Sequence, residues 1–262
     1  MTGYDEQPLL EAQNLHLRFG GISALVGVNL AVYPKQLLSI IGPNGAGKSS
    51  LLNCLSGFYH PSEGVVRFNG SDISALPPHR RAAIGIARTF QGIQTYESMS
   101  VRENILSGFH CRMASGLFSG MFWLGRAQSE AMKFTEKAEE IIEFLELEEL
   151  RHERVGELGY GLRKRVDLGR ALALDPKVLI LDEPMAGMNP DEKADLARYI
   201  LDIHEERCIP VVLVEHDMEV VMDISDTVMV MEWGKSIALD SPEKVRCDQR
   251  VIDAYLGSGD AG

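Results

Sequence analysis

The chain has 262 residues, and 45% of them are hydrophobic, which is enough to bury a large core in one big domain or in two smaller lobes. Its formal net charge of −12 gives no overall electrostatic reason to bind nucleic acid, so nucleic acid is not an expected partner. The four scattered cysteines lack zinc-ligating spacing and fit a reducing cytoplasm. The acidic N-terminus has no apolar signal segment, and no apolar run approaches the ~20 residues that span a bilayer. Any membrane role is therefore expected to come through a partner.

The first segments of the chain predict β-strands. Residues 9–19 and 24–32 alternate loosely in hydropathy, and residues 65–68 form a short apolar run before a turn. Early strands of this kind favour an antiparallel sheet packed beside a parallel α/β core. Phe19 ends the first strand, where its ring could stack on adenine without reading the edge of the base. A lone aromatic residue at a strand end is, however, more often part of the core.

A phosphate-binding loop follows the strand predicted at 37–41. Gly42, Gly47, Lys48 and Ser49 have the strict spacing of such a loop, and a helix is predicted after it. The glycines let backbone N–H groups converge on polyphosphate at a helix N-terminus. Lys48 is expected to reach the β- and γ-phosphates, and Ser49 to ligate Mg²⁺. The residues expected to bind the nucleotide here are Gly42, Pro43, Asn44, Gly45, Ala46, Gly47, Lys48, Ser49 and Ser50.

Gln91 ends an apolar segment, 84–90, that predicts a buried strand. Sites in α/β proteins gather ligands at the ends of such strands, so the Gln91 amide is a candidate for contact with a metal ion or the attacking water. An exposed loop glutamine is the simpler interpretation when the residue is taken alone. After an irregular patch at 107–125, the residues at 133–150 have helical spacing, which predicts an inserted helical subdomain.

A glycine-bearing loop at 158–161 leads into an amphipathic basic helix at 162–172. Helix N-termini attract anions through their unpaired N–H groups, so this loop is a second candidate for nucleotide contact. The loop residues concerned are Gly159, Tyr160 and Gly161, and the nearby cationic residues are Arg163, Arg165 and Arg170.

Two further apolar strands end in polar side chains. The run 178–181 ends at Asp182 and Glu183, and the run 210–214 ends just before His216. Beside a phosphate loop, Asp182 is suited to hold the water shell of Mg²⁺, and Glu183 to accept a proton from a water aligned with the γ-phosphate. The His216 imidazole can donate to the γ-phosphate and hold the carboxylate and the water in line. Without a phosphate loop in the chain, Asp182 and Glu183 would be interpreted as part of an ordinary turn, and His216 as a structural histidine.

In this order, the motifs resemble those of the ATP-binding subunits of ABC transporters over essentially the whole chain. Residues 42–49 match the Walker A loop, 178–183 the Walker B strand and 158–162 the ABC signature. Gln91 matches the Q-loop, 186–189 the D-loop, His216 the switch histidine and Phe19 the adenine-stacking aromatic. The resemblance implies an α/β fold with a P-loop ABC ATPase core of mixed parallel sheet and helices, an N-terminal antiparallel β-subdomain and an inserted α-helical subdomain. It also implies ATP and Mg²⁺ as cofactors.

Within this family the chain is most similar to the ATPases of branched-chain amino acid importers. The similar segments are 87–91, 116–120, 126–130, 185–190 and 251–257, although importers of urea, amides and aromatic acids share this branch. The resemblance implies a single ABC ATP-binding domain over 1–262. Its parts would be the β-subdomain and first part of the core at 8–91, the helical subdomain at 92–157, the signature helix and second part of the core at 158–241, and a C-terminal helix and tail at 242–262.

The resemblance also implies partners. Two such subunits, identical or different, pair head to tail with ATP between the Walker A loop of one and the signature loop of the other. The helical segment and a groove near Gln91 would meet two integral membrane permease subunits, which engage a periplasmic or extracellular solute-binding protein. The chain would then lie at the cytoplasmic face of the inner (plasma) membrane, as a peripheral subunit.

Two alternatives compete with the importer interpretation. A non-transport ABC ATPase acting on nucleic acid or ribosomes is disfavoured by the acidic charge and the single ABC domain. Another P-loop enzyme, such as a kinase or GTPase, is disfavoured by the signature segment and His216.

Three positions depart from the family pattern. Gly159 stands where the signature has serine, Leu162 where it has glutamine, and Asn189 where the D-loop has aspartate. Gly159 has no hydroxyl for the γ-phosphate, so one contact across the dimer is expected to be missing. If the chain pairs with a different ATPase, the two composite sites would be unequal.

Overall fold

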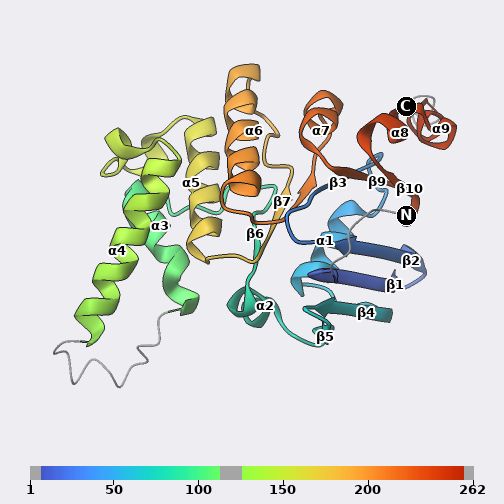
Figure 1. Ribbon diagram of the computed structural model, residues 1–262, viewed down its shortest axis with the longest axis horizontal. Helices are drawn as coiled ribbons and strands as arrows, with labels where there is room; N and C mark the ends of the chain where they lie inside the picture. Colours follow the sequence, from blue (N-terminus) through green and yellow to red (C-terminus); the bar gives the residue numbers. More distant parts are fainter. Residues whose placement is uncertain (1–6, 113–125, 257–262) are drawn as a thin grey trace.

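The computed structural model describes residues 7–112 and 126–256 and contains two β-sheets with helices around them (Figure 1). The smaller sheet is antiparallel and has the strand order β2-β1-β4-β5. Its strands are β1 (Leu10–Phe19), β2 (Ile22–Val32), β4 (Glu63–Phe68) and β5 (Ser71–Asp72). Two-residue turns join β1 to β2 and β4 to β5, and alternate side chains of β1 and β2 are buried against the core. The antiparallel sheet predicted for the N-terminal part is confirmed.

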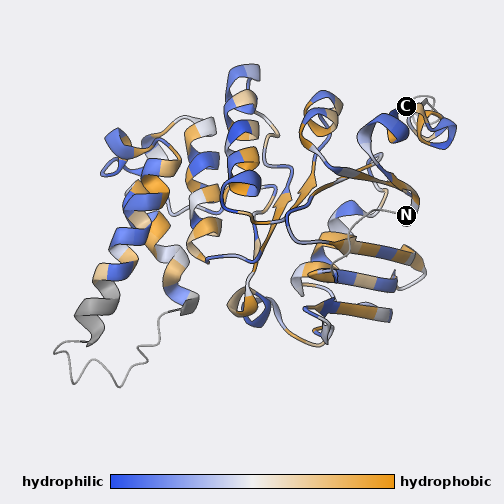
Figure 2. Cartoon of the chain, viewed as in Figure 1, coloured by the Kyte–Doolittle hydropathy of each residue, from blue (hydrophilic) through white to orange (hydrophobic). Residues whose placement is uncertain are grey.

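The larger sheet is mixed and has the order β10-β9-β3-β8-β7-β6. Its strands are β3 (Leu37–Ile41), β6 (Ile86–Arg88), β7 (Val178–Asp182), β8 (Val211–Val214), β9 (Thr227–Glu232) and β10 (Lys235–Asp240). All pairs are parallel except β9 with β10. Every residue of β3, β7 and β8 is buried, because helices and the smaller sheet cover both faces of these central strands. Figure 2 shows these strands as the apolar centre of the molecule.

Helix α1 (Lys48–Ser56) packs in the core between the two sheets. Three helices pack together at the end of the molecule opposite the smaller sheet (Figure 1). They are α3 (Val101–Gly108), α4 (Arg126–Phe144) and α5 (Tyr160–Ala173). The remaining helices are α2 (Pro78–Ile84), α6 (Pro190–Glu205), α7 (Met218–Ile224), α8 (Pro242–Cys247) and α9 (Gln249–Leu256). The predicted helical insertion is thus present, and its apolar side chains share a core with one face of the larger sheet.

Some element boundaries differ from those predicted. The helix predicted at 133–150 is α4, which ends at Phe144, and Glu146 then has a φ of 53°. A left-handed backbone cannot continue an α-helix, so the chain turns there and makes a short 3₁₀ turn at Glu148–Leu150. In the patch predicted to be irregular, residues 107–108 are the end of α3 and Phe109–Arg112 form a 3₁₀ helix, and residues 113–125 lie outside the described residues. Helix α2 and the strand pair β9 and β10 were not predicted.

The register of the larger sheet determines where the polar strand ends meet. Val214 of β8 lies opposite both Ile40 of β3 and Asp182 of β7. Because these strands are parallel, the segments that follow them emerge at the same edge. This edge therefore brings together the phosphate loop, the acidic pair and the histidine segment. In the part of the chain that the structure describes, no helix is both long and apolar enough to cross a membrane.

Candidate active site

The phosphate-binding loop connects β3 to α1, as predicted, and its glycines are required by its geometry. Gly42 and Gly47 have φ values of 147° and 100°. A Cβ atom on Gly42 would lie 2.1 Å from the Met231 carbonyl oxygen, and one on Gly47 would lie 2.7 Å from the Ala24 carbonyl oxygen. No larger side chain fits at either position, and the resulting tight loop directs backbone N–H groups toward the start of α1.

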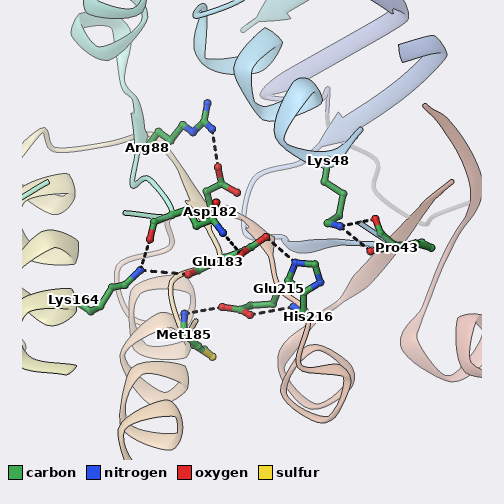
Figure 3. A network of polar contacts seen from close by, with 11 residues as sticks. Pro43, Lys48, Arg88, Lys164, Asp182, Glu183, Met185, Glu215 and His216 are labelled. Atoms are coloured by element: carbon green, nitrogen blue, oxygen red, sulfur yellow. Dashed lines mark hydrogen bonds and ion pairs between the residues drawn. The ribbon is translucent and has the colours of Figure 1, made fainter. Parts of the chain in front are cut away.

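Lys48 is the first residue of α1, and its ammonium group folds back over the loop. Its Nζ donates to the carbonyl oxygens of Gly42 at 2.7 Å and Pro43 at 3.1 Å (Figure 3). Burial lowers the pKa of Lys48, while the nearby carboxylates of Glu183 and Asp182 act in the opposite direction. An ammonium that has lost most of its water and keeps only neutral acceptors is well placed to gain from an anionic phosphate.

A cavity of about 390 Å³ opens over this loop. It has a volume in the range of small-molecule sites. Seven residues of the predicted loop line it, and so does Glu183, which comes from the end of β7. The other lining residues are Ile22, Ser23, Ala24, Trp233 and Gly234. The residues of the predicted phosphate-binding loop and the candidate base therefore face the same space.

Glu183 is held between the two other predicted catalytic residues. Its Oε2 accepts a hydrogen bond from the Gln91 amide at 2.8 Å, and its Oε1 lies 2.7 Å from His216 Nε2 (Figure 3). We assign a proton to Nε2, because an ionised carboxylate can only accept. The Glu183 side chain is 14% exposed and that of His216 is 43% exposed, so water can reach this cluster.

The backbone of Glu183 is strained, with a φ of 48°. This region costs a non-glycine residue on the order of 1–3 kcal/mol and persists only where the surroundings hold it. Here the Glu183 N–H donates to the Val214 carbonyl oxygen at 2.9 Å, in addition to the two side-chain contacts. The strain turns the Glu183 carboxylate out of the strand direction and into the cavity.

Asp182 lies at the end of β7 and pairs with a residue that the sequence analysis did not single out. Arg88 donates to Asp182 Oδ2 at 2.8 Å, and both side chains are nearly buried. The other guanidinium nitrogen of Arg88 donates to Asn53 and Ser56 of α1. This buried pair joins β6, β7 and α1 beneath the phosphate loop.

Lys164 is a second missed residue. Its ammonium is buried between α5 and the segment after β6, where it donates to the Gln91 carbonyl oxygen at 2.9 Å. Burial lowers the pKa of Lys164, and the carboxylates of Asp167, Glu215, Glu183 and Asp182 oppose this effect. One helical turn on, Asp167 accepts a hydrogen bond from the Gln94 backbone N–H, and Arg170 donates to the Gln94 carbonyl oxygen. Helix α5 therefore holds the Gln91 segment by its backbone.

We expect Lys164→Met to lower the turnover rate of ATP about tenfold and to leave the dissociation constant of MgATP within about twofold of the wild-type value. The expected loss of rate corresponds to about one hydrogen bond to a charged group, which is the contact that the substitution removes. The substitution keeps the length of the side chain but removes the donor that positions Gln91. Steady-state kinetics and a nucleotide titration would separate the two quantities. Lys177→Met, at an exposed position before β7, is the matched control. Wild-type turnover in Lys164→Met would contradict a positioning role.

Glu215, between β8 and His216, is also buried and was not predicted. Its carboxylate accepts from the backbone N–H groups of Met185 at 2.7 Å and His216 at 3.1 Å (Figure 3). Burial raises the pKa of Glu215 above its usual value, although these two backbone hydrogen bonds partly oppose the rise. The residue thus ties the segment after Glu183 to the histidine segment, and fixes the backbone on both sides of the cluster.

The other predicted nucleotide contacts are not among the residues that line this cavity, although Phe19 pairs across the β1–β2 hairpin with Ile22, which does line it. Gly159 is the N-cap of α5, and Tyr160 packs near Gly187 rather than among the lining residues. Phe19 is 47% exposed and contacts Tyr59 edge to face, and it does not line the cavity either. The basic side chains after Gly159 pair with carboxylates: Arg163 with Glu97, Arg165 with Asp195, and Arg170 with Asp167.

The structure gives Asn189 a local role. Its side chain accepts from the Glu192 N–H, and the Glu192 carboxylate accepts from the Asn189 N–H, which forms a capping box at the start of α6. Asparagine serves this position as well as aspartate does.

Comparison with known protein families agrees with this arrangement. The family model described as ABC transporter matches residues 25–186, and the model described as branched-chain amino acid ATP-binding cassette transporter matches residues 235–261. The first match spans the phosphate loop, the Gln91 segment, the α5 N-terminus and the acidic pair.

Individual relatives cover nearly the whole chain. It is 41% identical to the high-affinity branched-chain amino acid transport ATP-binding protein BraF of Pseudomonas aeruginosa, over 96% of this chain and 98% of that protein. It is 40% identical to the corresponding protein LivG of Escherichia coli K12, with the same coverage. A crystal structure of the ADP conformation of an ATP-binding cassette of an ABC transporter superposes with a TM-score of 0.84 at 35% identity, covering 96% of this chain and 100% of that one. The chain therefore belongs to the ATP-binding proteins of ABC transporters, in their branched-chain amino acid group.

Proposed function

We propose that this chain is the ATP-binding and ATP-hydrolysing subunit of an ABC importer that takes up branched-chain amino acids. The observation that carries the proposal is the single cavity shared by the phosphate loop and Glu183, whose carboxylate contacts both Gln91 and His216. The names of the relatives supply the solute class.

Nucleotide binding follows from the loop geometry. The triphosphate would lie across the N–H groups at the start of α1, and the Lys48 ammonium, with three donors, would turn from the loop carbonyls to the β- and γ-phosphates. The Ser49 hydroxyl, the Gln91 amide oxygen and Asp182 are all oxygen donors, which is the set that Mg²⁺ prefers together with phosphate oxygens and waters. The Gln91 amide donates through its nitrogen to Glu183, so its oxygen can face a metal ion. Bound Mg²⁺ would neutralise charge on the phosphates.

Hydrolysis requires a base beside the γ-phosphate. Glu183 points into the cavity from a strained backbone, and its two partners fix the direction of the carboxylate. It would accept a proton from the attacking water, while the Nε2–H of His216 turns from the carboxylate toward the developing charge on the γ-phosphate. Gln91 and His216 would both change partners when a γ-phosphate enters, so each can report on the occupancy of the site.

A second ATPase subunit is part of the proposal. The signature loop at Gly159–Gly161 does not line the cavity of its own chain, which leaves it available to close the cavity of a partner. A Cβ atom added at Gly159 would meet nothing within 4 Å, so the missing serine is not explained by crowding within this chain. The N–H groups at the start of α5 would hold the γ-phosphate there without a hydroxyl.

Coupling to permease subunits would pass through the Gln91 segment. Its backbone is attached to α5 by Lys164 and Arg170, and its side chain is attached to Glu183. A movement of the helical group α3 to α5 toward a partner would therefore be transmitted to the catalytic carboxylate. The chain would then be a peripheral subunit at the cytoplasmic face of the membrane, with a solute-binding protein on the other side.

Uptake measurements test the proposal. A strain that lacks this chain should lose most ATP-dependent uptake of leucine, isoleucine and valine, and the wild-type chain should restore it. The Glu183→Gln chain should assemble with integral membrane subunits, as detected by co-purification, without restoring uptake. If uptake of all three amino acids is undiminished and uptake of urea, amides or aromatic acids is lost, the result would contradict the proposal that the solute is a branched-chain amino acid. Co-purification with nucleic acid or ribosomes in place of membrane subunits would contradict transport.

A further inference from the structure

Two apolar side chains next to the phosphate loop are unusually exposed. Trp233 is 81% exposed and Ile22 is 72% exposed, the two highest values for large hydrophobic side chains in the described residues. Both line the cavity of about 390 Å³ above the phosphate loop. Exposed apolar side chains are ordinary when scattered, but two that border one cavity indicate a surface that a ligand covers.

The turn that carries Trp233 is rigid. Trp233 and Gly234 join β9 to β10 with φ values of 46° and 76°, the pattern of a two-residue type I′ turn. The Gly234 carbonyl oxygen accepts from the Val26 N–H at 2.8 Å, and the Gly234 N–H donates to the Ala46 carbonyl oxygen at 2.9 Å. The second bond attaches the turn directly to the phosphate loop.

Tryptophan is a poor choice for this turn on local grounds. A left-handed backbone is unfavourable for a bulky residue, and asparagine or glycine would form the turn with less strain. The large ring gains no burial from the described part of this chain, since it is almost fully exposed. Its placement beside the loop therefore suits a contact that forms only when the cavity is filled.

We propose that Trp233, together with Ile22, forms an apolar wall that contacts the nucleoside part of the bound nucleotide. This inference rests on the proposed function, because it assigns the end of the nucleotide that the phosphate loop does not hold. The indole ring would stack on the base or cover the ribose, and Ile22 would extend the wall toward β2. Phe19, the aromatic residue expected to stack on adenine, contacts Tyr59 and is not among the residues that line the cavity.

The chemistry of this wall determines its selectivity. An aromatic ring that stacks on a base contacts its π-face and does not read its hydrogen-bonding edge. The wall would therefore strengthen the binding of purine nucleotides generally, with little discrimination between adenine and guanine. It would contribute nothing to the binding of pyrophosphate, which has no base.

The test uses the full chain and the intrinsic fluorescence of Trp233. The chain contains two tryptophans, so Trp123→Phe leaves Trp233 as the only one. Saturating ADP should change its emission, and ADP is chosen because it lacks the γ-phosphate that would bridge two subunits. Trp233→Asn removes the ring and creates the Asn-Gly pair that best fits a type I′ turn, so the hairpin is retained.

Trp233→Asn should weaken ADP binding about tenfold, the scale of one base stacked on an aromatic ring, with pyrophosphate binding within about twofold of wild type. Trp233→Phe should recover part of the loss. Leu239→Ser, an exposed residue on β10 of the same hairpin and away from the cavity, should leave both ligands unaffected.

Three results would overturn the assignment. Equal loss of ADP and pyrophosphate binding in Trp233→Asn would mean that the turn acts only through the phosphate loop. Unchanged ADP binding, or an emission change confined to the MgATP-bound Glu183→Gln dimer, would mean that a partner subunit and not the nucleoside covers Trp233. Failure of the wild-type chain to bind either ligand would overturn the proposed function, and this inference with it.

Discussion

Replacement of Glu183 by glutamine is expected to lower the rate of ATP hydrolysis by about 10²–10⁴-fold, the range contributed by a positioned general base. An amide has nearly the same shape and keeps one acceptor oxygen, so it can retain the hydrogen bond from Gln91, and its amino group can face His216 once that imidazole takes the other tautomer. It cannot accept the proton of the attacking water, which is the step assigned to the carboxylate. MgATP should therefore still bind, and the ATP-bound closed dimer should accumulate.

Phosphate release and the mass of the complex in MgATP measure these two effects. Glu219→Gln is the matched control, because Glu219 is exposed on α7, three residues after His216, and contacts none of the catalytic residues named above. It should hydrolyse ATP as the wild type does. Normal hydrolysis by Glu183→Gln would show that another group accepts the proton.

Replacement of Lys48 by alanine is expected to raise the dissociation constant of MgATP at least about thirtyfold. Truncating one partner of a buried charge pair costs about 2–5 kcal/mol, and each 1.4 kcal/mol is about tenfold in affinity. In the structure the ammonium donates to the carbonyl oxygens of Gly42 and Pro43, which carry no net charge. Its contacts with the phosphates are therefore expected to form largely on binding, and their loss should appear in the affinity.

Calorimetric titration of nucleotide gives the affinity directly. Lys35→Ala, an exposed lysine before β3, should bind as the wild type does. A Lys48→Ala chain with unchanged affinity would remove Lys48 from the phosphate site. A lowered melting temperature with unchanged affinity would assign the ammonium to the stability of the loop alone.

Sequence reasoning predicted the parts of the site that are formed by residues adjacent to one another in the chain. The phosphate loop, the acidic pair after β7 and the histidine after β8 each follow a short apolar run of the length typical of a buried strand. Parallel strands then place the ends of such runs at one edge of a sheet. For this reason the proximity of Glu183 to His216 could be expected before the structure was known.

The residues that sequence reasoning missed depend on contacts between distant segments. Arg88 pairs with Asp182, 94 positions away, and Lys164 with the Gln91 carbonyl, 73 positions away. A signal was present in both cases. Arg88 interrupts an apolar strand, and Lys164 shares the buried face of α5 with Gly161, Leu168 and Ala171 at helical spacing. A charge on a buried face requires a partner, but only the fold identifies it.

The β9–β10 hairpin was missed for a related reason. Its two-residue turn, Trp-Gly, lacks the Asn-Gly or Asp-Gly pair that marks such turns in sequence. Here the turn is held by the Gly234 hydrogen bonds to β2 and to the phosphate loop, rather than by its own propensity. The same departure from local preference is what draws attention to Trp233.

Titration of MgATP into the purified wild-type chain tests the central claim most directly, because hydrolysis, dimerisation and coupling all begin with the phosphate loop. We predict saturable binding of about one nucleotide per chain, weakened when Mg²⁺ is removed and again when Lys48 is replaced by alanine. A chain that is folded, as judged by cooperative thermal unfolding, and that shows no saturable and magnesium-dependent affinity for ATP would contradict the assignment of this cavity.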